Sequence, residues 1–437
     1  MVCIGARTGA ITDANGAAVN VIGGYVELVA GIGIGAGDAI ETQVATLAAS
    51  GGSGGVNLAN TGALHIGDVN STSGVTATGG NIAVTASSPL TIDLAVSNTG
   101  GGTINLTAGA GGAADDLALN AAVTAAGGNG NITLAADDNV LQNAGGNVSA
   151  AGSGQVNVTA TNGSITMQSD AVTQADQGGI TYTAANAVTI GTDTGSASGA
   201  LRRSPAPPGG VTTIRRGSVT VRTMRGSPSS AASRGPRGRR DRTAAASNLL
   251  DSAGDITIAA GTTIEWAAPL DSSSQTGSRT VSLNDADSPP LAVNLYQPIK
   301  LGPNQTLTGQ GTTVNVYPTG SVQNGIDVSA SGATATVQPG TYTERIAFRG
   351  RPVTLQSTNP TDPNVVASTK LDGGHQGSVV TFNAGEGLGT VITGFTISGG
   401  VASGAGGGIY CRQASPSIIG NSILYNSAPG GWGAGGG

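Results

Sequence analysis

A short phrase of glycine or asparagine followed by alternating apolar and polar residues returns along this chain at a nearly constant interval. The phrases read GGVNLAN, GGNIAVTA, GGTINLTA, GNGNITLAA, GSGQVNVTA, GGITYTAA and, much later, AGDITIAA. In the first six phrases the first apolar residues are Val56, Ile82, Ile104, Ile132, Val156 and Ile180. The steps between these residues are 26, 22, 28, 24 and 24, and a period of this size indicates a solenoid.

Each repeat unit has the character of a strand between corners. Its apolar residues alternate with a period of two, Gly, Asn and Asp lie on both sides, and no helical stretch separates the units. One such coil cannot bury its apolar face alone, but stacked coils share a continuous core. We therefore predict an all-β solenoid.

Composition suits a narrow aliphatic core and argues against disorder. Charged residues make up 10% of the chain and aromatic residues 3%, whereas charged residues make up about 25% of a typical globular protein. A mean hydropathy of +0.06 and a net charge of −6 do not fit the low hydrophobicity and high charge of disordered chains. Cys3 and Cys411 form no readable disulfide framework or metal motif.

Targeting features are missing from the sequence as given. No apolar run approaches the ~20 residues of a membrane-spanning helix, and no basic segment followed by an apolar segment marks a signal peptide. The chain opens close to a repeat-like phrase and stops within a glycine-rich stretch. We therefore expect it to be a fragment of a longer protein.

Charge and proline content divide the chain into units. Residues 1–200 hold thirteen acidic residues and one basic residue, whereas residues 201–243 hold eleven arginines and five prolines. We predict Gly/Asn-rich repeats over 1–200, a basic low-complexity block over 201–250, residual repeats and a junction over 251–310, and a capped β-helix over 311–437. The predicted solenoid thus falls into two segments separated by an Arg/Pro-rich block.

Three interpretations of the basic block stay open. Arginine with Pro, Gly and Ser is typical of a disordered linker. Binding to nucleic acid or another anionic surface is not favoured, because no aromatic residues or recognisable module accompany the arginines. The abrupt change of composition, followed by a return to repeat text at AAASNLL, favours translation out of frame, which reading the coding DNA in its other frames would test.

The first 200 residues resemble the repeat region of filamentous-haemagglutinin-type adhesins. The resemblance rests on TGAITDANG, on the GGNI-V-TA phrases and on the corners at Asp115–Asp116 and Asp137–Asp138. It implies a right-handed parallel β-helix in a secreted or cell-surface bacterial protein, associated with the outer membrane.

Residues 311–437 resemble a right-handed parallel β-helix of the pectin-lyase-like kind. The text GSVQNGIDVSASGATATVQPGTYTERIAFRGRPVTLQS is similar to the opening of this fold in pectin methylesterases and bacterial surface repeat proteins. The resemblance implies a capping helix at about 322–328 and a strand over 334–337. The later GGGIYCRQASPSIIGNSILYNS resembles repeats of polymorphic outer-membrane proteins. There we expect positive φ in Gly406–Gly408 and left-handed corners at Asn421 and Asn426, with amides bonded to neighbouring coils.

The sequence contains no recognisable catalytic constellation. Resemblance to pectin methylesterases would imply phrases such as QDTL, DFIFG and LGRPW, and none occurs; GRPV at 350–353 matches the last only superficially. We therefore predict no catalytic residues, no cofactor and no metal site. His375 beside Asp372 is interpreted as a solvated turn, and the paired aspartates as corner residues that keep the stack soluble rather than as calcium ligands.

Three arginines are weak ligand candidates. Arg345, Arg349 and Arg351 lie within seven residues of one another and could meet an anionic glycan, although arginines also cover exposed coil ends. Trp266 and Trp432 are too isolated to predict a sugar-stacking platform.

The leading hypothesis is a non-enzymatic structural or adhesin-like part of a secreted or surface β-helix protein. Host or environmental glycans, or surface proteins, would be its partners, and nucleic acid is not favoured. The alternative is a truncated carbohydrate-active β-helix enzyme, a lyase, hydrolase or esterase, whose catalytic coils lie beyond residue 437.

Overall fold

The apolar residues that mark the sequence repeat lie above one another in the fold. The computed structural model describes residues 1–109, 114–192, 250–286, 290–404 and 406–429. In it, each repeat residue pairs in parallel register with its counterpart one coil away, in the order Val56, Ile82, Ile104, Ile132, Val156, Ile180 and Ile256. All seven are at most 1% exposed. The predicted β-solenoid with a shared aliphatic interior is therefore confirmed.

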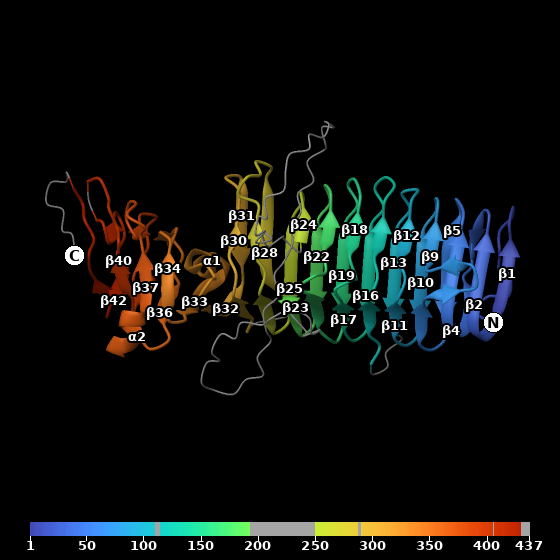
Figure 1. The fold of residues 1–437 in the computed structure, drawn as a ribbon. Coiled ribbons are helices and arrows are strands. Elements are labelled where there is room, and N and C mark those ends of the chain that lie inside the picture. The colour runs from blue at the N-terminus through green and yellow to red at the C-terminus, as the bar shows by residue number, and fades with distance from the viewer. Residues whose placement is uncertain (110–113, 193–249, 287–289, 405, 430–437) are drawn as a thin grey trace, which may run out of the picture.

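Three parallel ladders form the sides of the central coils (Figure 1). Ladder A contains β5 (Gly55–Asn60), β10 (Ile82–Ala86), β13 (Ile104–Ala108), β16 (Ile132–Ala136), β19 (Val156–Ala160), β22 (Ile180–Ala184), β25 (Ile256–Ala260), β28 (Arg279–Asp285) and β31 (Gln305–Gly309). Ladder B contains β6 (Leu64–Ile66), β11 (Leu90–Ile92), β14 (Leu117–Leu119), β17 (Val140–Gln142), β20 (Ile165–Gln168), β23 (Ala187–Thr192), β26 (Thr263–Trp266), β29 (Ala292–Leu295) and β32 (Gly311–Val316). Ladder C contains β9 (Val75–Ala77), β12 (Val96–Asn98), β15 (Val123–Ala125), β18 (Val148–Ala150), β21 (Thr173–Ala175) and β24 (Leu250–Ser252), and the pair β27 (Leu270–Asp271) and β30 (Ile299–Lys300) follows it.

The N-terminal coils are built from longer strands. These are β1 (Val2–Ala6), β2 (Val21–Ala30), β3 (Gly33–Ile34) and β4 (Ile40–Gly51). Strand β1 pairs with β2, and β2 pairs with β4. The long strand β4 pairs in turn with β5, β6 and β9. One antiparallel hairpin, β7 (Asp68–Val69) with β8 (Thr72–Ser73), projects from this region, and the repeat pattern did not predict it.

The turn of this hairpin holds one buried carboxylate. Glu27, 5% exposed, accepts hydrogen bonds from Asn70 Nδ2 at 2.8 Å, Ser71 N at 3.1 Å, Ser71 Oγ at 2.9 Å and Thr72 Oγ1 at 2.8 Å. The bond from Asn70, followed by that from Thr72, lowers the pKa of Glu27 to about 2. The ionised form of Glu27 therefore fastens the hairpin to β2.

We expect this fastening to weaken in acid. Because folding depresses the pKa of Glu27, its contribution to stability is complete above the ordinary glutamate pKa near 4.5 and is lost as the pH falls towards 2. The protection factor of the Ser71 amide, its exchange rate relative to that of an unstructured chain at the same pH, should fall over that interval. A Glu27→Gln variant should exchange faster at neutral pH and lose this pH dependence, and an unchanged profile in the variant would contradict the assignment.

The strands before and after residues 193–249 belong to one uninterrupted stack. Strands β21, β22 and β23 pair in register with β24, β25 and β26, so β23 and β24 belong to one coil. The predicted basic block at 201–250 lies outside the described residues except for Leu250, which is buried opposite Thr173. The solenoid is therefore not divided at this block.

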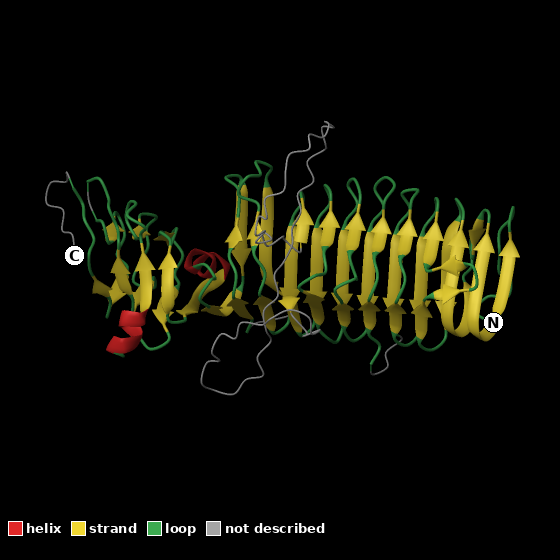
Figure 2. Ribbon diagram, viewed as in Figure 1, coloured by secondary structure: helices red, strands yellow, loops and turns green. Residues whose placement is uncertain are grey.

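The division into two segments lies instead at a helix, α1 (Val322–Val328) (Figure 2). Ladder B continues past it through β33 (Ser329–Val337), β36 (Thr354–Ser357), β39 (Val391–Thr393) and β42 (Ser417–Ile419). The other two sides are replaced by new ladders. One contains β34 (Gly340–Thr343), β37 (Thr369–Asp372), β40 (Thr396–Ser398) and β43 (Ser422–Ile423), and the other contains β35 (Ile346–Ala347), β38 (Val380–Phe382) and β41 (Ile409–Cys411). The helix and strand predicted at 322–328 and 334–337 are confirmed, and the second segment is joined to the first through one ladder.

Corner geometry in the last coils was predicted in part. Of the three glycines predicted to have positive φ, Gly406 has a φ of 65°, whereas Gly407 and Gly408 do not have a positive φ. Asn421 and Asn426 do bond the neighbouring coil, accepting from Phe395 N at 3.0 Å and Gly400 N at 2.8 Å. The left-handed conformation predicted for both asparagines is wrong, because the residue before each one takes it: Gly420 has a φ of 62° and Tyr425 a φ of 57°.

Candidate functional site

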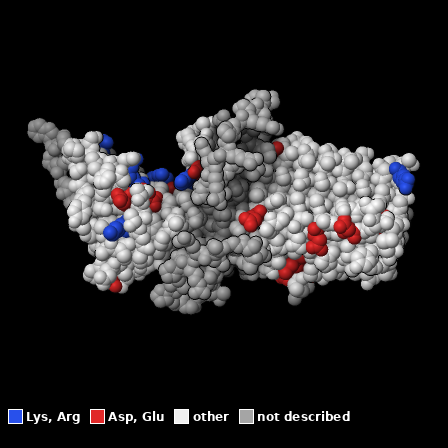
Figure 3. Space-filling model, viewed as in Figure 1, with Lys and Arg blue, Asp and Glu red and all other residues white. Residues whose placement is uncertain are grey.

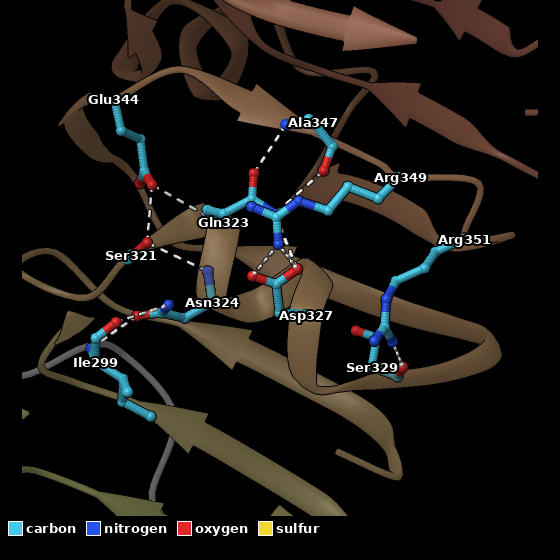
Figure 4. Close-up of polar contacts among 10 residues, drawn as sticks. All are labelled: Ile299, Ser321, Gln323, Asn324, Asp327, Ser329, Glu344, Ala347, Arg349 and Arg351. Atoms are coloured by element: carbon cyan, nitrogen blue, oxygen red, sulfur yellow. Dashed lines mark hydrogen bonds and ion pairs between the residues drawn. The ribbon is translucent and has the colours of Figure 1, made fainter. Parts of the chain in front are cut away.

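Two of the three predicted ligand arginines, Arg349 and Arg351, lie beside α1 (Figure 4). The Arg349 guanidinium contacts both carboxylate oxygens of Asp327, at 2.9 and 3.1 Å. The Asp327 side chain is only 8% exposed, whereas that of Arg349 is 61% exposed. Arg351 donates to the carbonyl of Ser329 at 3.2 Å. Two of the three arginines therefore hold α1 and the start of β33 against the following coil.

Two further observations concern Asp327, the partner of Arg349, and Arg345, the third candidate arginine. Burial raises the pKa of Asp327, and the Arg349 charge opposes that rise. A Cβ added to Gly377 would lie 2.7 Å from Arg345 Nη1, so the Arg345 side chain runs across that glycine. Ligand binding by the three arginines stays a prediction. The guanidinium groups of Arg349 and Arg351, which would contact such a ligand, already bond to Asp327 and to the Ser329 carbonyl.

The side-chain carboxamides of two consecutive residues of α1, Gln323 and Asn324, pair with strand backbones on opposite sides of the helix (Figure 4). Asn324 accepts from Ile299 N at 2.8 Å and donates to Ile299 O at 3.1 Å. Gln323 accepts from Ala347 N at 2.8 Å and donates to Ala347 O at 3.1 Å. Each carboxamide thus bonds both backbone groups of one residue, as a neighbouring strand would, and satisfies the edges of β30 and β35.

The N-terminus of α1 is capped from the coil that follows. Glu344 accepts from Val322 N at 2.6 Å, Gln323 N at 3.1 Å and Ser321 Oγ at 2.8 Å. A carboxylate at this position satisfies free N–H groups and complements the helix dipole. The α1 region is therefore an internally satisfied junction between two strand arrangements.

A groove with a volume of about 810 Å³ lies on the outer face of the β37–β40–β43 ladder. One wall is α2 (Pro363–Ser368), including Pro363 and Val366. This short helix is attached to the ladder by hydrogen bonds from Thr396 Oγ1 to Val366 O at 2.9 Å and from Thr369 Oγ1 to Val365 O at 2.8 Å. The volume falls within the range of small-molecule and glycan sites.

The floor and far wall of this groove come from later coils. Lys370 and Ser422 lie on the floor, and Leu424 and Tyr425 form the wall opposite α2. Sequence reasoning missed this site, because α2 lies more than fifty residues before Ser422, Leu424 and Tyr425 in the chain. The one available signal was Asp362-Pro363, since Asp at an N-cap followed by Pro is a helix start.

The acidic corners act as hydrogen-bond acceptors for the backbone. Asp138 accepts from the amides of Ala114 and Asp115, and Asp116 accepts from Asn139 N at 3.0 Å. Among the described residues, no three His, Cys, Asp or Glu side chains gather as metal ligands would. The aspartate pairs therefore join neighbouring coils.

The two histidines lie in different settings. His375 occupies a turn with a φ of 58°, and Asp372 accepts from Gly374 N at 2.9 Å within the same turn. His65 Nδ1 lies 2.7 Å from Asp93 Oδ2. From Asp93 a line of side-chain hydrogen bonds continues across the coils through Asn120, Asn143 and Gln168. Sequence reasoning did not single out this line, although its members recur at the same corner of successive coils.

Charge is distributed unevenly over the visible face (Figure 3). Acidic side chains are scattered along the N-terminal coils, and basic side chains gather on the C-terminal segment. Trp266 is fully buried and offers no surface to a sugar, while Trp432 lies outside the described residues.

Comparisons with known proteins leave the fold as the main guide to function. No protein-family model, curated protein or solved structure matches this chain. Over the part of the chain that the structure describes, no helix is long and apolar enough to span a bilayer.

Proposed function

We propose that this chain is part of a non-enzymatic structural or adhesin-like β-helix protein that is secreted or displayed on a bacterial surface. The observation that supports the proposal is the parallel sheet that runs from β1 to β42. A stack of this kind is a stiff rod in which each coil contacts only its neighbours. Such a rod can hold binding surfaces away from a cell.

The outer side of ladder A supports the same proposal. Its outward residues are small and uncharged, and they lie in register along the stack: Asn57, Ala83, Asn105, Thr133, Asn157, Thr181 and Thr257. Uncharged hydroxyl and amide groups repeated at about 4.8 Å intervals give a long, uniform polar surface. Such a surface suits extended contact with glycans or surface proteins.

The proposal is tested by displaying the chain on a non-adherent bacterium through an unrelated outer-membrane anchor. We expect the displayed chain to retain several-fold more cells on a surface coated with glycan or host protein than the anchor alone. A display control that destabilises the coils around β26, Trp266→Ala, should reduce retention. Equal retention by the anchor alone would contradict the adhesin role. Release of oligosaccharides from acidic polysaccharides by the purified chain would favour the enzyme alternative.

A further inference from the structure

Tyr425 is held in an unusual conformation beside the α2 groove. Its φ is 57° and the residue is 88% exposed. Bulky residues rarely adopt positive φ, and such residues gather at functional sites when the surrounding structure fixes them. Here Gly399 N donates to Tyr425 O at 3.3 Å, and the next residue, Asn426, accepts from Gly400 N at 2.8 Å. Bonds to the preceding coil therefore fix a corner that presents an aromatic ring to solvent.

The floor of the groove supplies a cation and hydroxyl groups in register. Lys370, Thr396 and Ser422 occupy equivalent positions on three neighbouring strands. Among the described residues Lys370 forms no ion pair. Thr396 Oγ1 already donates to Val366 O, so a ligand lying along the stack would meet a positive charge at Lys370 and the Ser422 hydroxyl two strand spacings, about 9.6 Å, further on.

We propose that the groove between α2 and Tyr425 binds an acidic glycan segment, with a carboxylate- or sulfate-bearing sugar at Lys370 and a second sugar ring against Tyr425. An aromatic ring offers a flat apolar face to the C–H face of a sugar, and the ammonium group pairs with the acid. The Ser422 hydroxyl donates to and accepts from sugar hydroxyls. Pro363 and Val366 exclude water from the other side. The inference deepens the proposed adhesin role, on which it rests for its biological meaning.

The test is a titration of the purified chain with three oligosaccharides of similar length, followed by calorimetry or NMR. The probes are oligogalacturonate, which carries carboxylates, a heparin-derived oligosaccharide, which carries sulfates, and a neutral cello-oligosaccharide. We expect one of the two acidic probes to bind at least about tenfold more tightly than the neutral one. Its affinity should fall as salt rises, because the ion pair at Lys370 is exposed.

Variants then locate the binding site. Tyr425→Ala and Lys370→Gln should each weaken binding by about tenfold or more, and Lys370→Gln should also flatten the salt dependence. Tyr425→Phe keeps the ring and should bind within about twofold of the native chain. Tyr425→Gly should lose binding while its melting temperature stays equal or rises, because glycine adopts positive φ freely. Tyr25→Ala and Lys300→Gln, which change exposed residues far from the groove, serve as matched controls.

Several outcomes would overturn the inference. It fails if no acidic probe binds at millimolar concentration, if the neutral probe binds equally well, or if the Tyr425 and Lys370 variants bind like the controls. The adhesin role is judged separately by cell retention. Oligosaccharide binding without cell retention would leave the groove assigned and the adhesin role rejected, whereas retention that survives Tyr425→Ala would place adhesion elsewhere on the rod.

Discussion

Replacing Trp266 by alanine should destabilise the coils around it by about 3–5 kcal/mol, the usual cost of truncating a large buried aromatic residue. Trp266 is fully buried and stacks in register between Ile190 and Leu295 of the neighbouring coils. Its neighbours above and below, Ile190 and Leu295, are both fully buried, so we expect that little nearby could move in to fill the space. Chemical denaturation followed by circular dichroism would measure the loss.

A control separates the lost volume from the lost indole. None of the described residues accepts a hydrogen bond from the Trp266 N–H, so Trp266→Phe removes an unsatisfied donor while keeping most of the ring. We expect it to cost less than about 1.5 kcal/mol. In Trp266→Ala, hydrogen exchange should accelerate in β23, β26 and β29 and stay unchanged in β10 and β13, because solenoid coils are stabilised mainly by their neighbours. Equal acceleration in β10 would mean that the rod unfolds as one unit.

The sequence predicted the stacking because the solenoid depends on local regularity. Each coil repeats the same alternation, so the spacing of Ile82, Ile104 and Ile132 alone indicates which residues lie above one another. The helix α1 and the strand over residues 334–337 were expected from the resemblance of one continuous stretch, residues 320–357, to the opening of a known fold. These features depend on residues that are close together in the chain.

Features that depend on distant partners were not predictable in this way. The carboxamides of Gln323 and Asn324 look like ordinary helix residues, and their partners Ala347 and Ile299 lie 24 and 25 residues away. The groove likewise combines α2 with Tyr425 from a later coil. The conformations of Asn421 and Asn426 were mispredicted: their side chains bond to the neighbouring coil, and the left-handed corner lies at the residue before each asparagine.

The junction also explains how one rod can change its strand arrangement without exposing edges. An unpaired strand edge invites association with other chains. At α1 two ladders end and two begin, and the amides of residues 323 and 324 occupy the hydrogen-bonding groups of Ala347 and Ile299. Ladder B alone crosses the junction by backbone pairing, between β32 and β33. The side chains of Gln323 and Asn324 therefore supply much of the remaining hydrogen bonding between the two segments.

Replacing Asn324 by leucine should reveal how much this connection contributes. Leucine has the same branching and number of heavy atoms as asparagine but cannot bond to Ile299, so a buried N–H and a buried C=O lose their partner. Each unsatisfied buried group costs about 1–3 kcal/mol, and Ile299 is only 4% exposed. We expect a lower denaturation midpoint, and faster hydrogen exchange at Ile299 in particular.

The matched control is Asn364→Leu in α2, where the asparagine side chain is exposed and the change should fall within about 0.5 kcal/mol. Gln323→Met provides the reciprocal test, since it should release Ala347 and leave Ile299 protected. If Asn324→Leu lowered the stability as little as Asn364→Leu, water or a shifted backbone would have to bond the N–H and C=O of Ile299. The Asn324 carboxamide could then not be the group that closes the edge of β30. Loss of protection at Ile299 alone in one variant and at Ala347 alone in the other would instead show that consecutive residues of one short helix close two separate sheet edges.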